Sequence, residues 1–260
     1  KMFKRFILFC LALVLMGVLL TQSVFASPKY TTKWEKINTP VNLPILMYHS
    51  VENKPGNGLC VPPEQLEQQL KYLHEQGYYT VTPAEAYKIL VQNKVPKKHK
   101  KLVMVTFDDG YENNYTAAYP LLKKYHIHAT IGLITSKVDT QGMLTLKQIK
   151  EMKKSKWVSF VSHTQNHQEL DRLDEAGQRE EMQASRTWLK QNLHQKPDLL
   201  VYPVGRYNEV SPKVAKESGY KLALTTQPGP ANAEQGKYEL HRQRVVPDMT
   251  QEAFAKLLQP

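Results

Sequence analysis

Apolar residues follow two spacings along the chain from about residue 44 onward. Short apolar runs predict buried strands, whereas apolar residues three and four positions apart predict amphipathic helices. The expected strands cover residues 45–48, 78–81, 102–107, 129–134, 157–161, 199–202, 220–225 and 240–246. The expected helices lie around residues 66–73 and at 83–92, 115–125, 146–153, 174–192, 212–218 and 251–258. Strands and helices therefore alternate along this whole segment.

The alternation predicts the topology of the sheet. Successive strand–helix units place their strands parallel to one another. This number of units in one domain favours a sheet that closes into a barrel over an open sheet. The sequence has no internal repeat and no sign of a second domain, so we expect one α/β domain at residues 44–260.

The first 26 residues have the features of a secretory signal peptide. Lys4 and Arg5 precede an almost unbroken apolar stretch at residues 6–20, and residues 24–26 (V-F-A) resemble a cleavage site. A retained membrane anchor is the alternative, because the apolar stretch is near the short end of a spanning helix. The polar residues 27–43 are interpreted as a linker. We expect a secreted protein, or one held at the cell wall or membrane surface.

The chain is basic, with a formal net charge of +11, and loss of Lys1, Lys4 and Arg5 with the first 26 residues leaves +8. Much of this charge lies at residues 94–101. That stretch is either a solvated loop or a surface that attracts an anionic cell-wall polymer or membrane. It lacks interleaved aromatic residues, so nucleic acid is not an expected partner. Cys60 is the one cysteine left after the first 26 residues are removed, which excludes an intrachain disulfide.

Residues that can carry chemistry follow two of the apolar runs. Asp108 and Asp109 follow one run, and His163 and His167 follow another. Adjacent strand residues face opposite sides, but Gly110 permits a turn that gives the two carboxylates different surroundings. One carboxylate with two imidazoles is a usual ligand set for a divalent metal, and the other carboxylate is then free to act as a base. Helix capping by the aspartate and ordinary loop histidines are the alternatives.

These residues also carry a family resemblance. Thr106–Gly110 reads T-F-D-D-G, and His163–His167 reads H-T-Q-N-H, each after an apolar run. In this order the motifs resemble the polysaccharide deacetylase family, the NodB-homology domains of carbohydrate esterase family 4, over roughly residues 44–257. The resemblance implies a distorted (β/α)-barrel with about seven parallel strands.

The resemblance further implies a role for each of the four residues. Asp109, His163 and His167 would bind a divalent metal, expected to be Zn²⁺, with Co²⁺ or Ni²⁺ as alternatives. The metal would acidify a water molecule and polarise the carbonyl of an N-acetyl group. Asp108 would accept the proton of that water as general base.

A third family motif, often R-P-P-Y-G, corresponds to V-Y-P-V-G at residues 201–205. The resemblance implies that the Val204 N–H stabilises the oxyanion, a task that does not depend on the side chain. Val201 stands where the family has an arginine that orients the catalytic aspartate. The possible replacements, among which the sequence does not choose, are Arg206, Arg242 and Arg244.

The general acid of the family is a histidine from an L-x-H motif, supported by an aspartate from a D-x-x-D-W motif. The first motif survives only loosely as Glu239-Leu240-His241, and the second is absent. We therefore expect His241 to be the general acid, with packing or a substrate contact as its alternative role. His49, just after the apolar run 45–48, is the second candidate, either as a substrate-binding group or as a surrogate acid.

These features predict an exported, metal-dependent N-deacetylase that acts on an N-acetylhexosamine polymer such as peptidoglycan, a chitin-like chain or poly-N-acetylglucosamine. Two alternatives stay open: an O-acetyl esterase acting on acetylated polysaccharide, and a catalytically inactive wall-binding domain. The expected partners are the polysaccharide and, through residues 94–101, an anionic cell-wall polymer. We expect a monomer.

Overall fold

The computed structural model describes residues 33–98 and 101–259. Seven strands close into a barrel in the order β2-β12-β11-β10-β9-β8-β7, and β7 pairs back with β2. Their bounds are β2 (Ile45–Tyr48), β7 (Leu102–Phe107), β8 (Ala129–Leu133), β9 (Val158–Ser162), β10 (Leu199–Val201), β11 (Leu222–Pro228) and β12 (Leu240–Arg244). Every neighbouring pair is parallel, and the short strand β5 (Tyr79–Thr80) joins β7 outside the ring. The expected barrel of about seven parallel strands is confirmed.

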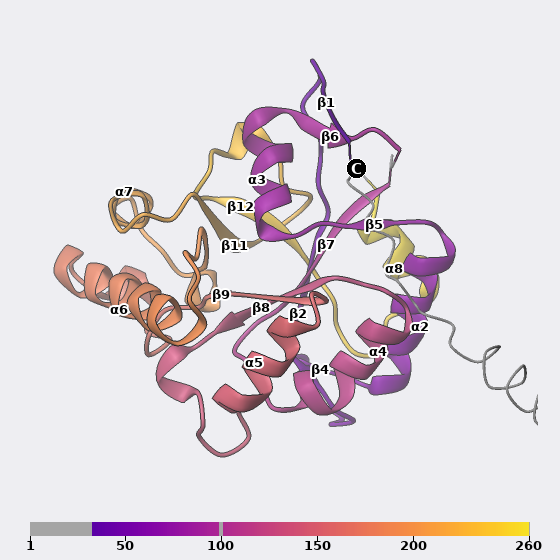
Figure 1. Cartoon of the computed structure of the whole chain (residues 1–260), viewed down its shortest axis with the longest axis horizontal. Helices are drawn as coiled ribbons and strands as arrows, with labels where there is room; N and C mark the ends of the chain where they lie inside the picture. Colours follow the sequence, from indigo (N-terminus) through magenta and orange to yellow (C-terminus); the bar gives the residue numbers. More distant parts are fainter. Residues whose placement is uncertain (1–32, 99–100, 260) are drawn as a thin grey trace, which may run out of the picture. The chain divides into compact units, whose positions relative to one another are not determined.

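Helices cover the outside of this barrel (Figure 1). The α-helices are α2 (Pro63–Glu75), α3 (Pro83–Gln92), α4 (Tyr119–Lys124), α5 (Leu146–Lys154), α6 (Glu175–Leu193), α7 (Ser211–Glu217) and α8 (Gln251–Leu257). Shorter helical turns are η1 (Asn114–Ala118), η2 (Thr135–Lys137), η3 (Leu170–Arg172), η4 (Pro203–Gly205) and η5 (Ala233–Gln235). The helices α6 and α7 lie together on one flank of the barrel, away from α2 and α4 (Figure 1).

Alternate residues of each strand point into the barrel. On β7, Met104 lies in a buried apolar cluster that also contains Val161 of β9 and Val201 of β10. Thr106 follows Met104 in the same inward row, and Asp108 continues that row beyond the end of β7. Both Thr106 and Asp108 are buried. The barrel interior is therefore apolar along the strands and becomes polar at their carboxyl ends.

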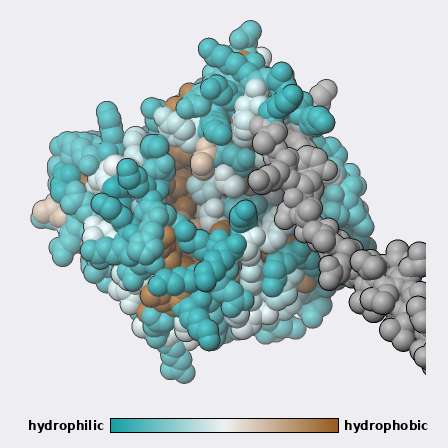
Figure 2. All heavy atoms as spheres, in the orientation of Figure 1, coloured by the Kyte–Doolittle hydropathy of each residue, from teal (hydrophilic) through white to brown (hydrophobic). Residues whose placement is uncertain are grey.

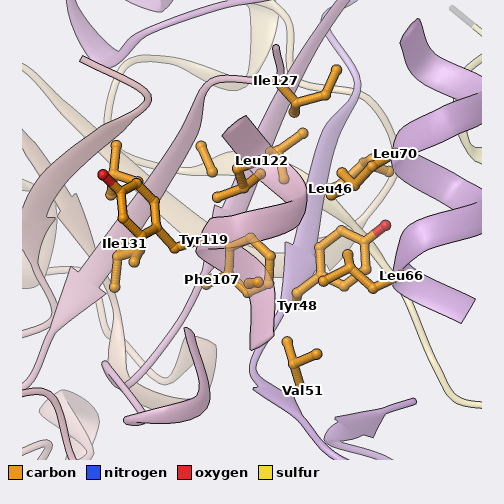
Figure 3. Packing of buried hydrophobic residues seen from close by; sticks show 14 of the residues in the cluster. Leu46, Tyr48, Val51, Leu66, Leu70, Phe107, Tyr119, Leu122, Ile127 and Ile131 are labelled. Carbon is orange, nitrogen blue, oxygen red and sulfur yellow. The ribbon is translucent and has the colours of Figure 1, made fainter. Parts of the chain in front are cut away.

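A second apolar cluster fixes the outer face of β2 and β7. Tyr48 and Phe107 stack with their ring centroids 5.1 Å apart. Figure 3 shows Tyr48 beside Leu66 of α2, so this stack also joins the two strands to a helix. His49 and Asp108 directly follow the two stacked residues in the chain. The packing therefore holds the ends of both strands at the place where polar residues begin.

Short strands order two segments that lack an apolar pattern. β1 (Trp34–Lys36) pairs antiparallel with β6 (Lys94–Pro96). β1 lies within the expected linker, and β6 lies within the basic stretch, for which the sequence predicts a loop or a charged surface. These residues thus form a two-stranded sheet, held by backbone hydrogen bonds. β3 (Ser50–Val51) and β4 (Cys60–Val61) form a further parallel pair.

The expected signal peptide at residues 1–26 lies outside the described residues, as do residues 99–100 of the basic stretch. Across residues 33–98 and 101–259, no helix has the length and apolar character needed to cross a membrane.

Candidate metal centre

Three side chains that the sequence predicts to be metal ligands meet at the carboxyl end of the barrel. Asp109 follows β7, His163 follows β9, and His167 lies four residues further on. The Nε2 atoms of His163 and His167 lie 3.4 and 3.5 Å from Asp109 Oδ1. The three ligand atoms lie within 4.8 Å of one another. We call these residues the ligand triad, and their spacing suits a single divalent ion.

A turn after β7 gives the two adjacent aspartates different surroundings. Asp109 has a φ of 73° and Gly110 a φ of 82°, so the chain leaves the extended strand here. The positive φ favours glycine at position 110, and a Cβ there would also lie 2.8 Å from the Cδ2 of Leu133, so that this side chain would have to move. Asp108 therefore stays on the inward row, whereas Asp109 faces the two histidines.

A backbone carbonyl fixes the orientation of His163. Its Nδ1 lies 2.8 Å from the carbonyl oxygen of Val201, so a protonated Nδ1 donates there and Nε2 stays free for a metal. Burial disfavours a charge on this ring, but the hydrogen bond with Asp109 and the nearby carboxylates outweigh it and raise the pKa of His163. A carbonyl partner on one nitrogen, with the second nitrogen directed at the other ligands, is typical of histidines that bind metals.

A buried carboxylate ties the loop that carries His167 to α6. Glu181 is 4% exposed and accepts hydrogen bonds from Asn166 N at 2.8 Å and from Asn166 Nδ2 at 2.7 Å. Gln168 Nε2 donates to the same carboxylate at 3.3 Å, and Gln165 N donates to the Glu181 carbonyl at 3.1 Å. His167 has a φ of 61°, a conformation that a residue other than glycine keeps only when its surroundings hold it. Glu181 therefore holds the residues on both sides of His167.

Arg242 on β12 is the partner of Asp108. Its Nη1 donates to Oδ1 at 2.8 Å and its Nη2 to Oδ2 at 2.7 Å, and both side chains are buried. Arg242 also donates to Thr106 Oγ1 and to the Thr225 carbonyl. Burial opposes the ionisation of Asp108, but the guanidinium outweighs it and holds the pKa of this carboxyl far below its usual range. Of the three arginines that the sequence left open, Arg242 is the one that orients Asp108.

The two candidate acids lie in different surroundings. His49 follows β2, and its Nε2 lies 3.8 Å from Asp108 Oδ2. His241 precedes Arg242 on β12, and adjacent strand residues face opposite sides. Because Arg242 points into the barrel, His241 points outward, with its Nδ1 3.4 Å from the position of a Cβ built on Gly229. None of the hydrogen bonds or ion pairs among the described residues joins His241 to the ligand triad, which disfavours its expected role as general acid.

Val204 lies on η4, the turn after β10, with a φ of 56°. This conformation is unusual for a β-branched residue, and the side chain is 55% exposed. In the part of the chain that the structure describes, the Val204 N–H has no hydrogen-bond acceptor. A Cβ on the neighbouring Gly205 would clash with Thr226, so the turn requires glycine there. The free N–H agrees with the expected role as a donor to an oxyanion.

Two residues of the site were missed by the sequence analysis. Tyr111 directly follows the D-D-G motif, and burial together with the Asp109 carboxylate, to which it hydrogen-bonds, raises the pKa of its phenol. Its place beside the motif could have identified it. Glu181 lies 15 positions from Asn166 within an amphipathic helix, where a glutamate has no distinguishing pattern.

Comparisons with known proteins agree with this geometry. The family model for polysaccharide deacetylases matches residues 76–223. YxkH of Bacillus subtilis, which carries the same family name, is 44% identical over 229 residues, covering 88% of this chain and 80% of that protein. The poly-beta-1,6-N-acetyl-D-glucosamine N-deacetylase of Staphylococcus aureus is 28% identical over 194 residues, covering 69% of this chain and 65% of that protein.

Solved structures share the fold. The deacetylase PplD of Streptococcus pyogenes, in complex with acetate, superposes with a TM-score of 0.81 at 39% identity, covering 85% of this chain and 100% of that chain. IcaB of Ammonifex degensii gives a TM-score of 0.71 at 27% identity, covering 84% of this chain and 95% of that chain. The family match, the similar proteins and the shared barrel together show that this chain belongs to the polysaccharide deacetylase family.

Proposed function

We propose that this protein is a metal-dependent N-deacetylase that hydrolyses the N-acetyl groups of an N-acetylhexosamine polymer. The observation that carries the proposal is the separation of two adjacent carboxylates. Asp109 faces two imidazoles, whereas Asp108 is held by Arg242. Metal-assisted hydrolysis needs both a metal site and a base beside it. The two aspartates supply one residue for each task.

The ligand triad fits a divalent ion. It offers one carboxylate oxygen and two imidazole nitrogens, a set that Zn²⁺ accepts and that Co²⁺ or Ni²⁺ also binds. The contact of His163 Nδ1 with the Val201 carbonyl leaves Nε2 in the form that a metal needs. When bound, the ion would supply an acidified water molecule and a polarised acetyl carbonyl.

Asp108 is the proposed general base. Its lowered pKa keeps it ionised at neutral pH, so it is always able to accept a proton. The same lowered pKa makes it a weak base, and efficient transfer then needs a proton donor more acidic than free water. The proposed base and the proposed metal site therefore depend on one another.

His49 is the proposed general acid, in place of His241. Cleavage of an amide leaves an amine that must gain a proton. His49 Nε2 lies 3.8 Å from Asp108 Oδ2, next to the proposed base, whereas His241 lies on the face of β12 opposite to Arg242. The Val204 N–H would donate to the oxyanion of the tetrahedral intermediate.

The substrate class rests on the relatives and on the completeness of the site. The Staphylococcus aureus relative is named for removing acetyl groups from poly-β-1,6-N-acetylglucosamine. An O-acetyl esterase is the second candidate, because the same residues could hydrolyse an acetyl ester. An inactive wall-binding domain is disfavoured, since the triad, the Asp108–Arg242 pair and His49 lie together.

An acetate-release assay tests the proposal. The substrates are β-1,4-linked N-acetylglucosamine oligomers, poly-β-1,6-N-acetylglucosamine, peptidoglycan and acetylated xylan, each with and without a chelator. We expect chelator-sensitive release from at least one N-acetylated polymer. Release from xylan alone would favour the esterase, and no release by metal-loaded protein would favour the inactive domain.

We also propose that the protein is exported and acts as a monomer at the cell wall. The signal-like residues 1–26 and the basic stretch at residues 94–101 support this proposal. Sequencing of the mature N-terminus tests it. A start at Ser27 is expected, whereas a chain that keeps residues 1–26 in the membrane fraction would support a retained anchor. Gel filtration would test the oligomeric state.

A further inference from the structure

A groove along α6 has no part in the proposed chemistry of the ligand triad. It lies along α6, opposite the turn η2, and has a volume of about 900 Å³. This is within the range of roughly 300–1,000 Å³ that is typical of ligand sites. The α6 residues that line it recur three and four positions apart from Ala176 to Gln191, on one face of the helix. Figure 2 shows apolar atoms (brown) within the polar surface beside α6.

The groove contains one residue of the loop that carries the two triad histidines. Gln165 lines the groove and lies two residues from both His163 and His167. Its carbonyl accepts a hydrogen bond from Ser136 N of η2 at 3.0 Å, and its N–H donates to the Glu181 carbonyl of α6 at 3.1 Å. Gln165 therefore links the loop between the two triad histidines to both sides of the groove, η2 and α6.

The lining of the groove matches a neutral sugar chain. Its hydrogen-bonding groups are mostly uncharged amides and hydroxyls, which both donate and accept; they belong to Thr135, Ser136, Gln165, Gln183, Thr187 and Gln191. Two charged residues also line the groove: Arg179, which is already paired with Glu175 and Glu217 at 2.8 and 2.7 Å, and Glu180, an exposed carboxylate that would repel an anion. A strongly anionic polymer would need unpaired cations, and among its lining residues the groove offers none.

Trp188 adds the apolar surface that a sugar ring requires. It lines the groove and also packs against the cluster between the barrel and its helices. This packing limits the movement of the indole, so little conformational entropy is lost when a ligand stacks on it. A flat aromatic ring with uncharged polar neighbours can bind the apolar face of a pyranose and its hydroxyls together.

We propose that this groove binds the sugar residues next to the one that is deacetylated, with Trp188 stacking on a pyranose ring. The inference rests on the proposed function, because it places the acetylated residue at the ligand triad. It extends that function by making the length of the chain part of substrate recognition.

Kinetics on substrates of different length test the proposal. The substrates are N-acetylglucosamine oligomers, β-1,4-linked and β-1,6-linked, from the dimer to the hexamer. We expect kcat/KM to rise with length, and Trp188→Leu to lower it about tenfold for the hexamer while the dimer changes less than about twofold. Leucine keeps apolar volume toward the core but removes the ring. A second variant, Gln183→Ala with Thr187→Ala, changes only exposed residues and should act in the same direction.

Trp157→Leu is the matched control. Trp157 precedes the start of β9, whereas His163 of the triad follows the end of this strand, and Trp157 stacks on His126. It should leave the length dependence unchanged. Equal losses on dimer and hexamer in Trp188→Leu, or no loss at all, would overturn the proposal. Titration calorimetry with the hexamer separates the two proposals: binding that needs Trp188 without any turnover would keep the groove and reject the deacetylase. If the wild type does not bind the hexamer, the groove proposal fails.

Discussion

Arg242 and Asp108 are 134 positions apart in the chain, and two hydrogen bonds join their side chains inside the barrel. Arg242 Nη1 donates to Asp108 Oδ1 at 2.8 Å, and Nη2 donates to Oδ2 at 2.7 Å. β2 lies between the strands that carry them, because it pairs with β12 on one edge and with β7 on the other. The pair therefore spans β2 and forms only when these three strands are assembled. Assembly of this part of the barrel and the ionisation of the proposed base are coupled through the contact.

Replacement of Arg242 by methionine should destabilise the protein by about 3–5 kcal/mol, because it leaves Asp108 buried without a cation. Chemical denaturation measures this change. Arg206→Met is the matched control, since Arg206 is exposed and pairs with Asp171 at 2.9 Å. Loss of such a surface pair costs at most about 1 kcal/mol. Equal, small losses in both variants would contradict the account.

The stability gap between the wild type and Arg242→Met should depend on pH. In the wild type the pKa of Asp108 is lowered by folding, so its contribution is full above the unfolded value of about 3.9 and is lost as pH falls through the folded pKa. In the variant, burial without a cation raises the pKa of Asp108. The buried charge therefore destabilises the variant at neutral pH, and this destabilisation lessens at lower pH as Asp108 gains a proton. Denaturation at about pH 7 and pH 4 should show a narrower gap at the lower pH, and a wider gap would contradict the assignment.

The ligand triad should bind about one divalent ion per chain. Asp109→Ala and His163→Ala should each abolish this binding, because each removes one of three ligands. Elemental analysis after dialysis measures the metal content. His241→Ala should keep its metal, since this ring faces the outside of the barrel. Undiminished metal in either triad variant would show that the ion binds elsewhere.

Glu181→Gln should weaken metal binding by about 10–100-fold without removing a ligand, because the loop around His167 loses its carboxylate acceptor. Titration calorimetry with Zn²⁺ measures the affinity directly. Glu180→Gln is the matched control, an exposed neighbour on the same helix, and should bind the ion as the wild type does. Identical affinities in the two variants would remove Glu181 from the account.

His49→Ala should slow amide substrates far more than activated aryl acetates, because an aryl oxide leaves without a proton and an amine does not. General acid catalysis contributes roughly 10²–10⁴-fold, so the two substrate classes should separate clearly. His241→Ala should have a small effect on both. The reverse result, a selective loss on amides in His241→Ala alone, would restore His241 as the acid.

Local signals in the sequence predicted much of this fold. The apolar run 102–107 is β7, and the run 45–48 is β2. The helix expected at residues 83–92 is α3, whose capping box joins Thr82 and Glu85. The ligand triad could also be predicted, since its residues belong to two short motifs. In each case the decisive information lies within a few neighbouring residues.

The remaining features depend on contacts between distant segments. β1 and β6 have no apolar pattern and are ordered by pairing with one another. The expected helix 115–125 is divided into η1 and α4 near Pro120, which lacks an N–H donor. The sequence alone does not predict that Arg242 pairs with Asp108 or that His241 faces away from it, because both depend on the register of β12 in the barrel.

Turnover of an N-acetylglucosamine polymer by Asp108→Asn tests the central claim most directly, because asparagine keeps the size of the side chain but cannot accept the proton. With the metal content measured on the same sample, the account predicts that acetate release falls by at least ~10²-fold while about one ion per chain is retained. Undiminished release would contradict the role of Asp108 as base. Loss of the ion would instead make Asp108 a ligand and reverse the roles of the two aspartates.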